Sequence, residues 1–266
     1  MSIIYLTSTG GAPGVSTLAT ALTLNWPRPA LLLEADVSKT SHILGGYLRG
    51  QYEHTMGLTE VAVANQHGIL DVENLFAQTI DIGPSRYAIP GFNDLGGARG
   101  TSVAFWANLM SSINRLPGAA LAPDLDVIVD AGRFWVGDTR APLMAQADSV
   151  VVITGNTLPD IATVRASSAA FADTLDSSGH REYLGLCITT TPLKGQSYSA
   201  HEISNATGLP LLGVLPWDPA TAGHYSHGAA ATGRRSPYHR ALDELIRHLD
   251  ETLAERRYVP TGQEHA

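Results

Sequence analysis

The chain has 266 residues, and 44% of them are hydrophobic, so it can bury one large core. Its formal net charge of -8 argues against the basic face that nucleic-acid-binding proteins usually carry, and DNA binding is not expected. No apolar run approaches the length of about eighteen residues that a transmembrane helix needs, and the single Cys187 cannot form an internal disulfide, which favours the cytoplasm.

Short β-rich runs alternate with longer helical patterns along the chain. Strands are predicted over residues 3–6, 30–36, 87–91, 126–130, 149–154, 184–189 and 211–215. Helical patterns start near residue 18 and recur over residues 40–48, 57–65, 103–113, 160–175 and about 237–256. Residues 91–100 and 223–236 are rich in glycine or small polar residues and are expected to be loops.

This alternation predicts an α/β fold. We expect a single doubly wound, mostly parallel sheet with helices on both faces. One domain over residues 1–258 should contain it, followed by a frayed tail at residues 259–266.

A glycine-rich segment, TGGAPGVST at residues 9–17, lies between the first strand and the first helix. Backbone N–H groups in such a turn can bind phosphate at a helix N-terminus, so the candidate binding residues are Gly10, Gly11, Ala12, Gly14, Val15, Ser16 and Thr17. The Ser16 hydroxyl could also ligate Mg²⁺. The alternative is a simple strand-to-helix turn in which Ser16 or Thr17 caps the helix.

The loop lacks the lysine that a phosphate-binding loop normally carries, because Val15 stands at that position. Pro13 also removes one N–H group. The missing cation would serve mainly the charge of the transition state, so hydrolysis should suffer more than binding.

Two aspartates end predicted strands, where a doubly wound sheet places its ligand crevice. Asp130 fits the acidic position that holds Mg²⁺, and Asp36 could position a catalytic water, although each could instead cap a local turn or helix. Arg133 could bring a guanidinium to a bound phosphate, although such an arginine is more often on the surface. Lys39, just beyond Asp36, is expected to be a solvated lysine.

These segments, together with residues 147–152 and 212–218, resemble the ParA/MinD-type ATPases over about residues 2–255. More narrowly, the chain is similar to the lysine-poor relatives of actinobacteria and to the TadZ/CpaE-like proteins of pilus systems. The resemblance implies ATP or ADP with Mg²⁺ as cofactors and a nucleotide-sandwich homodimer. It also implies a protein partner from a positioning, secretion-pilus or partition system.

The resemblance also implies roles for particular residues. Pro216, Trp217 and Asp218 match the loop that contacts the base, although Trp217 could instead be packed inside a strand-to-helix turn. The family's second signature lysine corresponds to Gly10, so both lysines are absent here.

Two hypotheses follow from the sequence. The first is a ParA/MinD-like nucleotide-binding protein with weak or absent ATP hydrolysis, acting in the positioning or assembly of cellular machinery. The second is a nucleotide-independent pseudo-ATPase scaffold that binds partners through its loops. The last helix mixes acids with its arginines, so direct membrane anchoring is not expected, although a partner could recruit the chain to a membrane-associated complex.

Overall fold

The computed structural model describes residues 1–11, 13–118, 125–176, 179–192, 195 and 197–257. In this part of the chain the strands form one sheet, in the order β3-β4-β2-β5-β1-β6-β7-β8. Neighbouring strands pair in parallel, except that β3 and β4 form an antiparallel hairpin at one edge. The strands are β1 (Ile3–Ser8), β2 (Ala30–Glu34), β3 (Ile80–Gly83), β4 (Arg86–Ile89), β5 (Asp126–Arg133), β6 (Ser149–Gly155), β7 (Leu184–Thr189) and β8 (Leu211–Leu215). The predicted α/β class with a mostly parallel sheet is confirmed.

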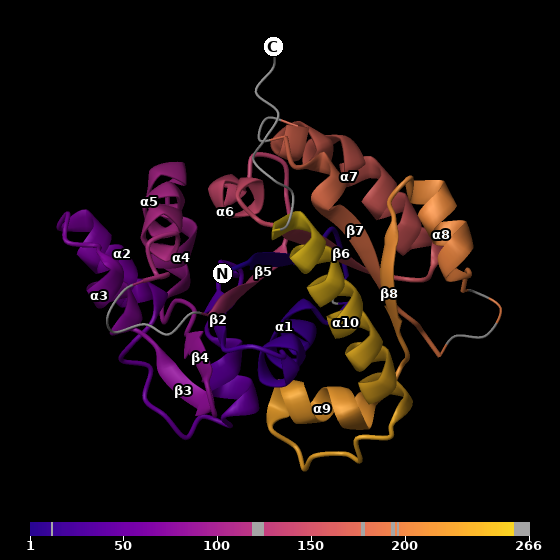
Figure 1. The fold of residues 1–266 in the computed structure, drawn as a ribbon, viewed down its shortest axis with the longest axis horizontal. Helices are drawn as coiled ribbons and strands as arrows, with labels where there is room; N and C mark the ends of the chain where they lie inside the picture. The colour runs from indigo at the N-terminus through magenta and orange to yellow at the C-terminus, as the bar shows by residue number, and fades with distance from the viewer. Residues whose placement is uncertain (12, 119–124, 177–178, 193–194, 196, 258–266) are drawn as a thin grey trace.

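Helices cover both faces of the sheet (Figure 1). On one face lie α1 (Val15–Asn25), the π-helical turn η1 (Ile43–Tyr47), α9 (Pro219–His227) and α10 (Pro237–Arg257). On the other face lie α2 (Leu58–Gln66), α3 (Val72–Phe76), α4 (Leu95–Arg99), α5 (Val103–Ile113), α6 (Ala141–Ala145), α7 (Leu158–Asp176) and α8 (Ala200–Thr207). A short 3₁₀ turn, η2 (Arg181–Tyr183), leads into β7.

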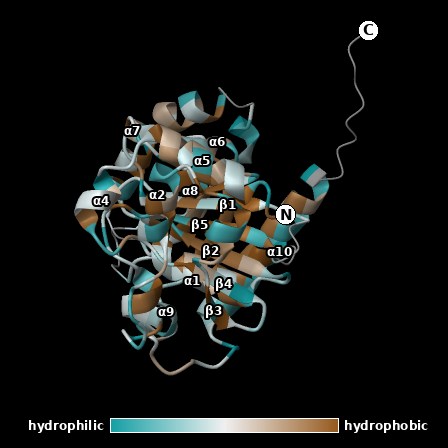
Figure 2. Ribbon diagram, turned by 90° about the vertical axis from the view of Figure 1, so that its left-hand side faces the viewer, coloured by the Kyte–Doolittle hydropathy of each residue, from teal (hydrophilic) through white to brown (hydrophobic). Residues whose placement is uncertain are grey.

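Alternating side chains of the strands build one hydrophobic core on each face. In β1, Ile3 and Tyr5 belong to one core, and Ile4 and Leu6 belong to the other. Figure 2 shows the hydrophobic strands β1, β5 and β2 lying in the middle of the molecule, between the helices. Strands buried on both faces explain why the sequence shows continuous apolar runs.

Several short elements differ from the sequence prediction. The segment 91–100, expected to be a loop, contains α4, because the Asp94 carboxylate accepts a hydrogen bond from the Gly97 amide and caps the helix. The expected loop at residues 223–236 likewise begins inside α9. The helical pattern at residues 40–48 is a π-helical turn, in which the Leu48 amide donates to the Ile43 carbonyl at 2.9 Å. The predicted tail, residues 259–266, lies outside the described residues.

Candidate functional site

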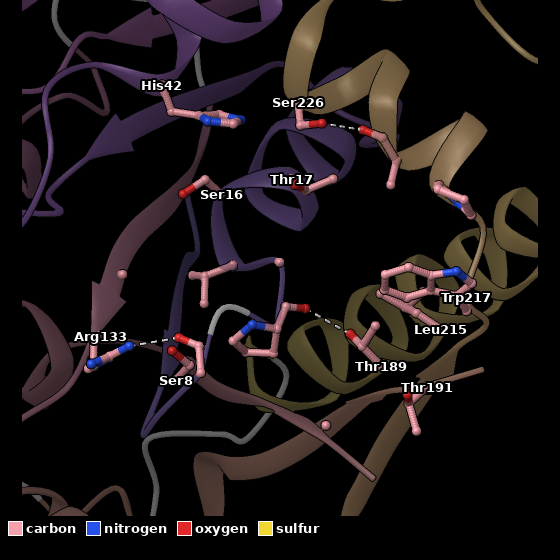
Figure 3. A pocket seen from close by; sticks show the side chains of 18 of the residues that line it. Ser8, Ser16, Thr17, His42, Arg133, Thr189, Thr191, Leu215, Trp217 and Ser226 are labelled. Carbon is pink, nitrogen blue, oxygen red and sulfur yellow. Dashed lines mark hydrogen bonds between the residues drawn. The ribbon is translucent and has the colours of Figure 1, made fainter. Parts of the chain in front are cut away.

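The carboxyl ends of the parallel strands open into a pocket of about 1160 Å³. Its walls come from the glycine-rich loop after β1 and from the segments that follow β2, β5, β7 and β8. Figure 3 shows Ser16 and Arg133 on one side of this pocket and Trp217 on the opposite side. Chain segments as far apart as Ser8 and Tyr238 therefore meet at the edge where doubly wound sheets bind ligands.

The glycine-rich loop is shaped by left-handed backbone at Gly11 and Gly14, with φ of 62° and 95°. Gly14 precedes α1, and within the described residues no side chain caps this end of the helix, so Ser16 and Thr17 do not act as caps. The first backbone amides of α1 therefore lack partners inside the helix, and Val15, Ser16 and Thr17 line the pocket. Ala12 lies outside the described residues.

Two side chains hold the loop from either side. The Thr189 hydroxyl donates to the Pro13 carbonyl at 3.0 Å, and the Arg133 guanidinium donates to the Gly11 carbonyl at 2.8 Å. Gly10 does not line the pocket, because its Cα faces α7, where an added Cβ would lie 3.2 Å from the Thr163 side chain. The role of Arg133 towards a phosphate stays a prediction.

The strand-end aspartates each use one oxygen for a local turn. Asp36 Oδ1 accepts hydrogen bonds from the Ser38 amide at 2.9 Å and the Ser38 hydroxyl at 2.6 Å. Asp130 Oδ1 accepts from the Gly132 amide at 3.1 Å. The second oxygen of each carboxylate lies near Lys39, and the two carboxylate side chains are only 8% and 1% exposed. Both aspartates therefore combine a capping role with a place at the loop.

Lys39 is not the solvated lysine that the sequence suggested. Its Nζ donates a hydrogen bond to Ser16 Oγ and lies 3.5 Å from Asp36 Oδ2 and 3.7 Å from Asp130 Oδ2. Burial alone would lower the pKa of Lys39, but the carboxylates of Asp130, Asp36 and Glu34 outweigh burial and raise the pKa above its ordinary value. The ammonium is therefore charged and lies beside the loop.

Sequence reasoning missed Lys39 because it looked for a lysine inside the loop itself. A signal was available, since Lys39 is one of only two lysines in the chain and follows Asp36 by three residues. Beside it, burial and the nearby ammonium lower the pKa of His42 to about 4, so this imidazole is neutral and adds no positive charge.

A buried ion pair fixes the loop that follows β5. The Arg140 guanidinium binds both oxygens of Asp138, at 2.8 and 2.6 Å, and both side chains are almost fully buried. It also donates to the Ala35 carbonyl at 3.0 Å and to the Arg133 carbonyl at 2.7 Å, and it stacks on Trp135. Arg140 thus joins the residue after β2 to the end of β5, where Arg133 is the last residue.

The other side of the pocket carries the segment predicted to contact a base. Pro216, Trp217 and Asp218 all line the pocket, and Trp217 is 57% exposed, so the alternative of a buried tryptophan is wrong. The Trp217 amide donates to Thr190 Oγ1 at 3.0 Å. Asp218 caps α9 by accepting from the Thr221 amide, and this bond lowers the pKa of Asp218. The indole is available to stack on a flat ligand.

Oxygen donors suited to Mg²⁺ do meet around the Lys39 ammonium at the pocket wall, namely Ser16 Oγ and the carboxylates of Asp36 and Asp130. The Lys39 ammonium, however, lies between them, so the donors do not fit a metal ion while Lys39 stays there. Elsewhere in the described chain no group of three His, Cys, Asp or Glu residues could hold a metal, and no helix is long and apolar enough to cross a membrane.

No protein-family model matches the sequence, and no curated protein matches it. Solved structures do. The septum site-determining protein MinD of Pyrococcus horikoshii OT3, complexed with Mg-ADP, has a TM-score of 0.70 and 16% identity, covering 97% of this chain and 99% of its own. A ParA family ATPase from Chlorobium tepidum TLS has a TM-score of 0.69 and 14% identity, covering 93% and 99%.

A chain of the MinC:MinD cell division protein complex of Aquifex aeolicus also matches, with a TM-score of 0.70 and 14% identity over 94% of this chain and 96% of its own. The chain therefore has the fold of the MinD and ParA ATPases, as its motifs predicted. The narrower likeness to TadZ/CpaE-like proteins stays a prediction.

Proposed function

We propose that this protein binds ATP or ADP in the pocket between α1 and the segment 216–218, with weak or absent hydrolysis. The observation that carries the proposal is the meeting of three parts in one pocket. These are an uncapped helix N-terminus behind a glycine-rich loop, charged groups at the strand ends, and an exposed tryptophan on the opposite wall. The first part suits phosphate, and the last suits a purine.

Weak hydrolysis follows from the loop itself. Val15, the first residue of α1, is only 6% exposed and packs into the core, and it carries no charge to offer a phosphate. Without a loop cation, developing charge on a transferring phosphoryl group is less well stabilised than in phosphate-binding loops that keep the lysine. The Lys39 ammonium lies at the position where Ser16 and Asp130 would hold Mg²⁺, so it is a positive charge beside the loop.

The fold supports a wider role in placing or assembling cellular machinery. One matching structure is named as a MinC:MinD cell division complex and another as a ParA family ATPase. By analogy, this chain would form a homodimer and act with a protein partner of a positioning, secretion-pilus or partition system, from the cytoplasm. Exposed apolar side chains beside the pocket, Trp135 and Val136, are 40% and 82% exposed and give such a contact an apolar surface.

Titration calorimetry with ATP and with ADP tests the proposal. We expect saturable binding, and we expect Trp217→Ala to weaken it by about tenfold or more, because stacking of one base on an aromatic side chain contributes about 1–3 kcal/mol. Trp217→Phe is the matched control, since it keeps an aromatic face and should retain most of the affinity. Release of phosphate from ATP, measured in the same samples, should be slow or undetectable.

The competing hypothesis is a scaffold that binds no nucleotide. It predicts no heat of binding for either nucleotide at millimolar concentration, and that result would overturn the proposal. Equal affinity of the wild type and Trp217→Ala would instead place the base elsewhere in the pocket.

A further inference from the structure

We propose that Lys39 is the resident cation of this pocket. Its ammonium takes the place of Mg²⁺ between Ser16, Asp36 and Asp130, and it binds the phosphates of a nucleotide without a metal ion. The inference rests on the proposed function, because it names the cation that the nucleotide would meet.

The contacts of Lys39 leave no room for a metal beside it. Its Nζ is hydrogen-bonded to Ser16 Oγ, the atom that would ligate Mg²⁺, and lies within 3.7 Å of both carboxylates. A Mg²⁺ ion held by the same oxygens would need ligand distances of about 2.0–2.1 Å. The ammonium and the metal would therefore claim the same space, and one excludes the other.

The same contacts leave the ammonium able to bind an anion. Its separations of 3.5 and 3.7 Å from Asp36 and Asp130 are ion-pair distances, longer than the roughly 2.7–3.2 Å of an N–H···O hydrogen bond. Its Nζ donates to Ser16 Oγ and is also within hydrogen-bonding reach of Asp36, whereas a lysine ammonium has three N–H donors. The Lys39 side chain is 38% exposed and lines the pocket, so the remaining donors can reach a phosphate there.

The backbone holds Lys39 in this place. The Asp36 carboxylate accepts from the Ser38 amide and hydroxyl, which closes a turn immediately before the lysine. Val37 is 4% exposed and packs in the core that contains Tyr5, which anchors the same turn. The backbone of Lys39 is thus fixed by a hydrogen-bonded turn with a buried anchor, and the contacts of Nζ with Ser16 and the two aspartates hold the side chain.

Charge balance also favours a built-in cation. Two nearly buried carboxylates require compensation, and a buried anion without a partner is costly. Lys39 provides a positive charge within 3.7 Å of both carboxylates. The amides at the start of α1 add a second attraction for the phosphates.

The test compares ATP binding in EDTA and in millimolar Mg²⁺ for the wild type, Lys39→Met and Lys39→Gln. We expect the wild type to bind equally well in both buffers, within about twofold. We expect both variants to lose about tenfold or more in EDTA and to recover affinity in Mg²⁺, because the metal can then occupy the vacated position. Arg247→Met is the control, since it removes the same charge from the exposed face of α10.

If the wild type binds ATP only with Mg²⁺, and Lys39→Met binds Mg-ATP as tightly or more tightly, Lys39 is a plug that the metal displaces. That outcome overturns this inference and leaves the proposed function standing. Thermal unfolding without nucleotide tests separately whether Lys39 occupies the metal position, and this test does not require nucleotide binding. Mg²⁺ should raise the Tm of Lys39→Met and Lys39→Gln but leave the wild type and Arg247→Met unchanged, and an equal response of all four proteins would refute the assignment.

Discussion

Gly132 sets the distance between β5 and the Asp36 side chain. Its φ is +57°, and a Cβ added to it would lie 2.2 Å from Asp36 Cγ, so no side chain fits without moving that carboxylate. The Gly132 amide also donates to Asp130, and its carbonyl accepts from Thr7 Oγ1 at 3.0 Å. One glycine therefore keeps both strand-end aspartates in place.

Gly132→Ala should accordingly be much more harmful than an alanine in the loop after β5, where this contact is absent. We expect a loss of about 2–4 kcal/mol in the free energy of unfolding, from left-handed backbone and overpacking together. Gly137→Ala is the control, because its φ is +79° but nothing lies within 4 Å of the added Cβ, so only about 1 kcal/mol should be lost. Urea unfolding measures the stability of both variants. Equal losses would show that the Asp36 side chain moves aside for the added Cβ at little cost.

At the scale of the elements, Arg140 connects the end of β2 with the loop between β5 and α6. Its partners are the Asp138 carboxylate and the carbonyls of Ala35, Ala131 and Arg133. Breaking a buried pair leaves an uncompensated charge, which costs far more than the pair contributes when intact. The position of Arg133 in the pocket wall therefore depends on Arg140, which does not itself line the pocket.

We expect Arg140→Met to lower the free energy of unfolding by about 3–5 kcal/mol in urea denaturation. Adding Asp138→Asn to it should recover part of the loss, because the second change removes the unpaired carboxylate. Arg181→Met gives the comparison for an exposed pair, since Arg181 and Asp176 are 69% and 49% exposed, and it should cost about 1 kcal/mol or less. A small loss in Arg140→Met would mean that water replaces the guanidinium.

The elements also show what the sequence could and could not predict. The strands β1, β5, β6 and β7 were predictable, because their side chains are buried on both faces and read as apolar runs. The strand β3 was missed, because it is a four-residue edge strand with only one buried position. The contact of Lys39 with Ser16 could not be predicted, since it depends on β5 lying between β1 and β2 and on the turn at Asp36.

The stability of the whole molecule should depend on pH through Glu34. This carboxyl ends β2, where it accepts from the amides of Ile43 and Gly91 and from the Ser41 hydroxyl. Burial raises its pKa from 4.5 to about 7, although those hydrogen bonds oppose the shift. The folded protein therefore binds this proton more tightly than the unfolded chain. The contribution is fully present below about pH 4.5 and is lost as pH rises through about 7.

We expect the wild type to lose up to about 3 kcal/mol of stability from this group between about pH 5 and pH 8. Glu34→Gln should flatten that part of the profile, because the amide does not titrate. Glu60→Gln, on the exposed side of α2, should leave the profile unchanged. Urea unfolding midpoints measured across this pH range test the prediction. If stability falls equally with pH in Glu34→Gln and in the wild type, groups other than Glu34 cause the pH dependence.

The strand order has a consequence for the timing of synthesis. β1 pairs with β5 and β6, and β2 pairs with β5, so neither of the first two strands of the sequence is the other's neighbour. Ser16 follows β1 and Lys39 follows β2, and the two residues are only 23 positions apart in the sequence. The strand that lies between β1 and β2 in the sheet is β5, which ends at Arg133. After Lys39 has been synthesised, about a hundred more residues must follow before β5 can bring Lys39 and the glycine-rich loop together. At about 5–20 residues per second this delay is on the order of ten seconds. During that interval a chaperone or partner would meet an exposed β1 edge before any pocket exists.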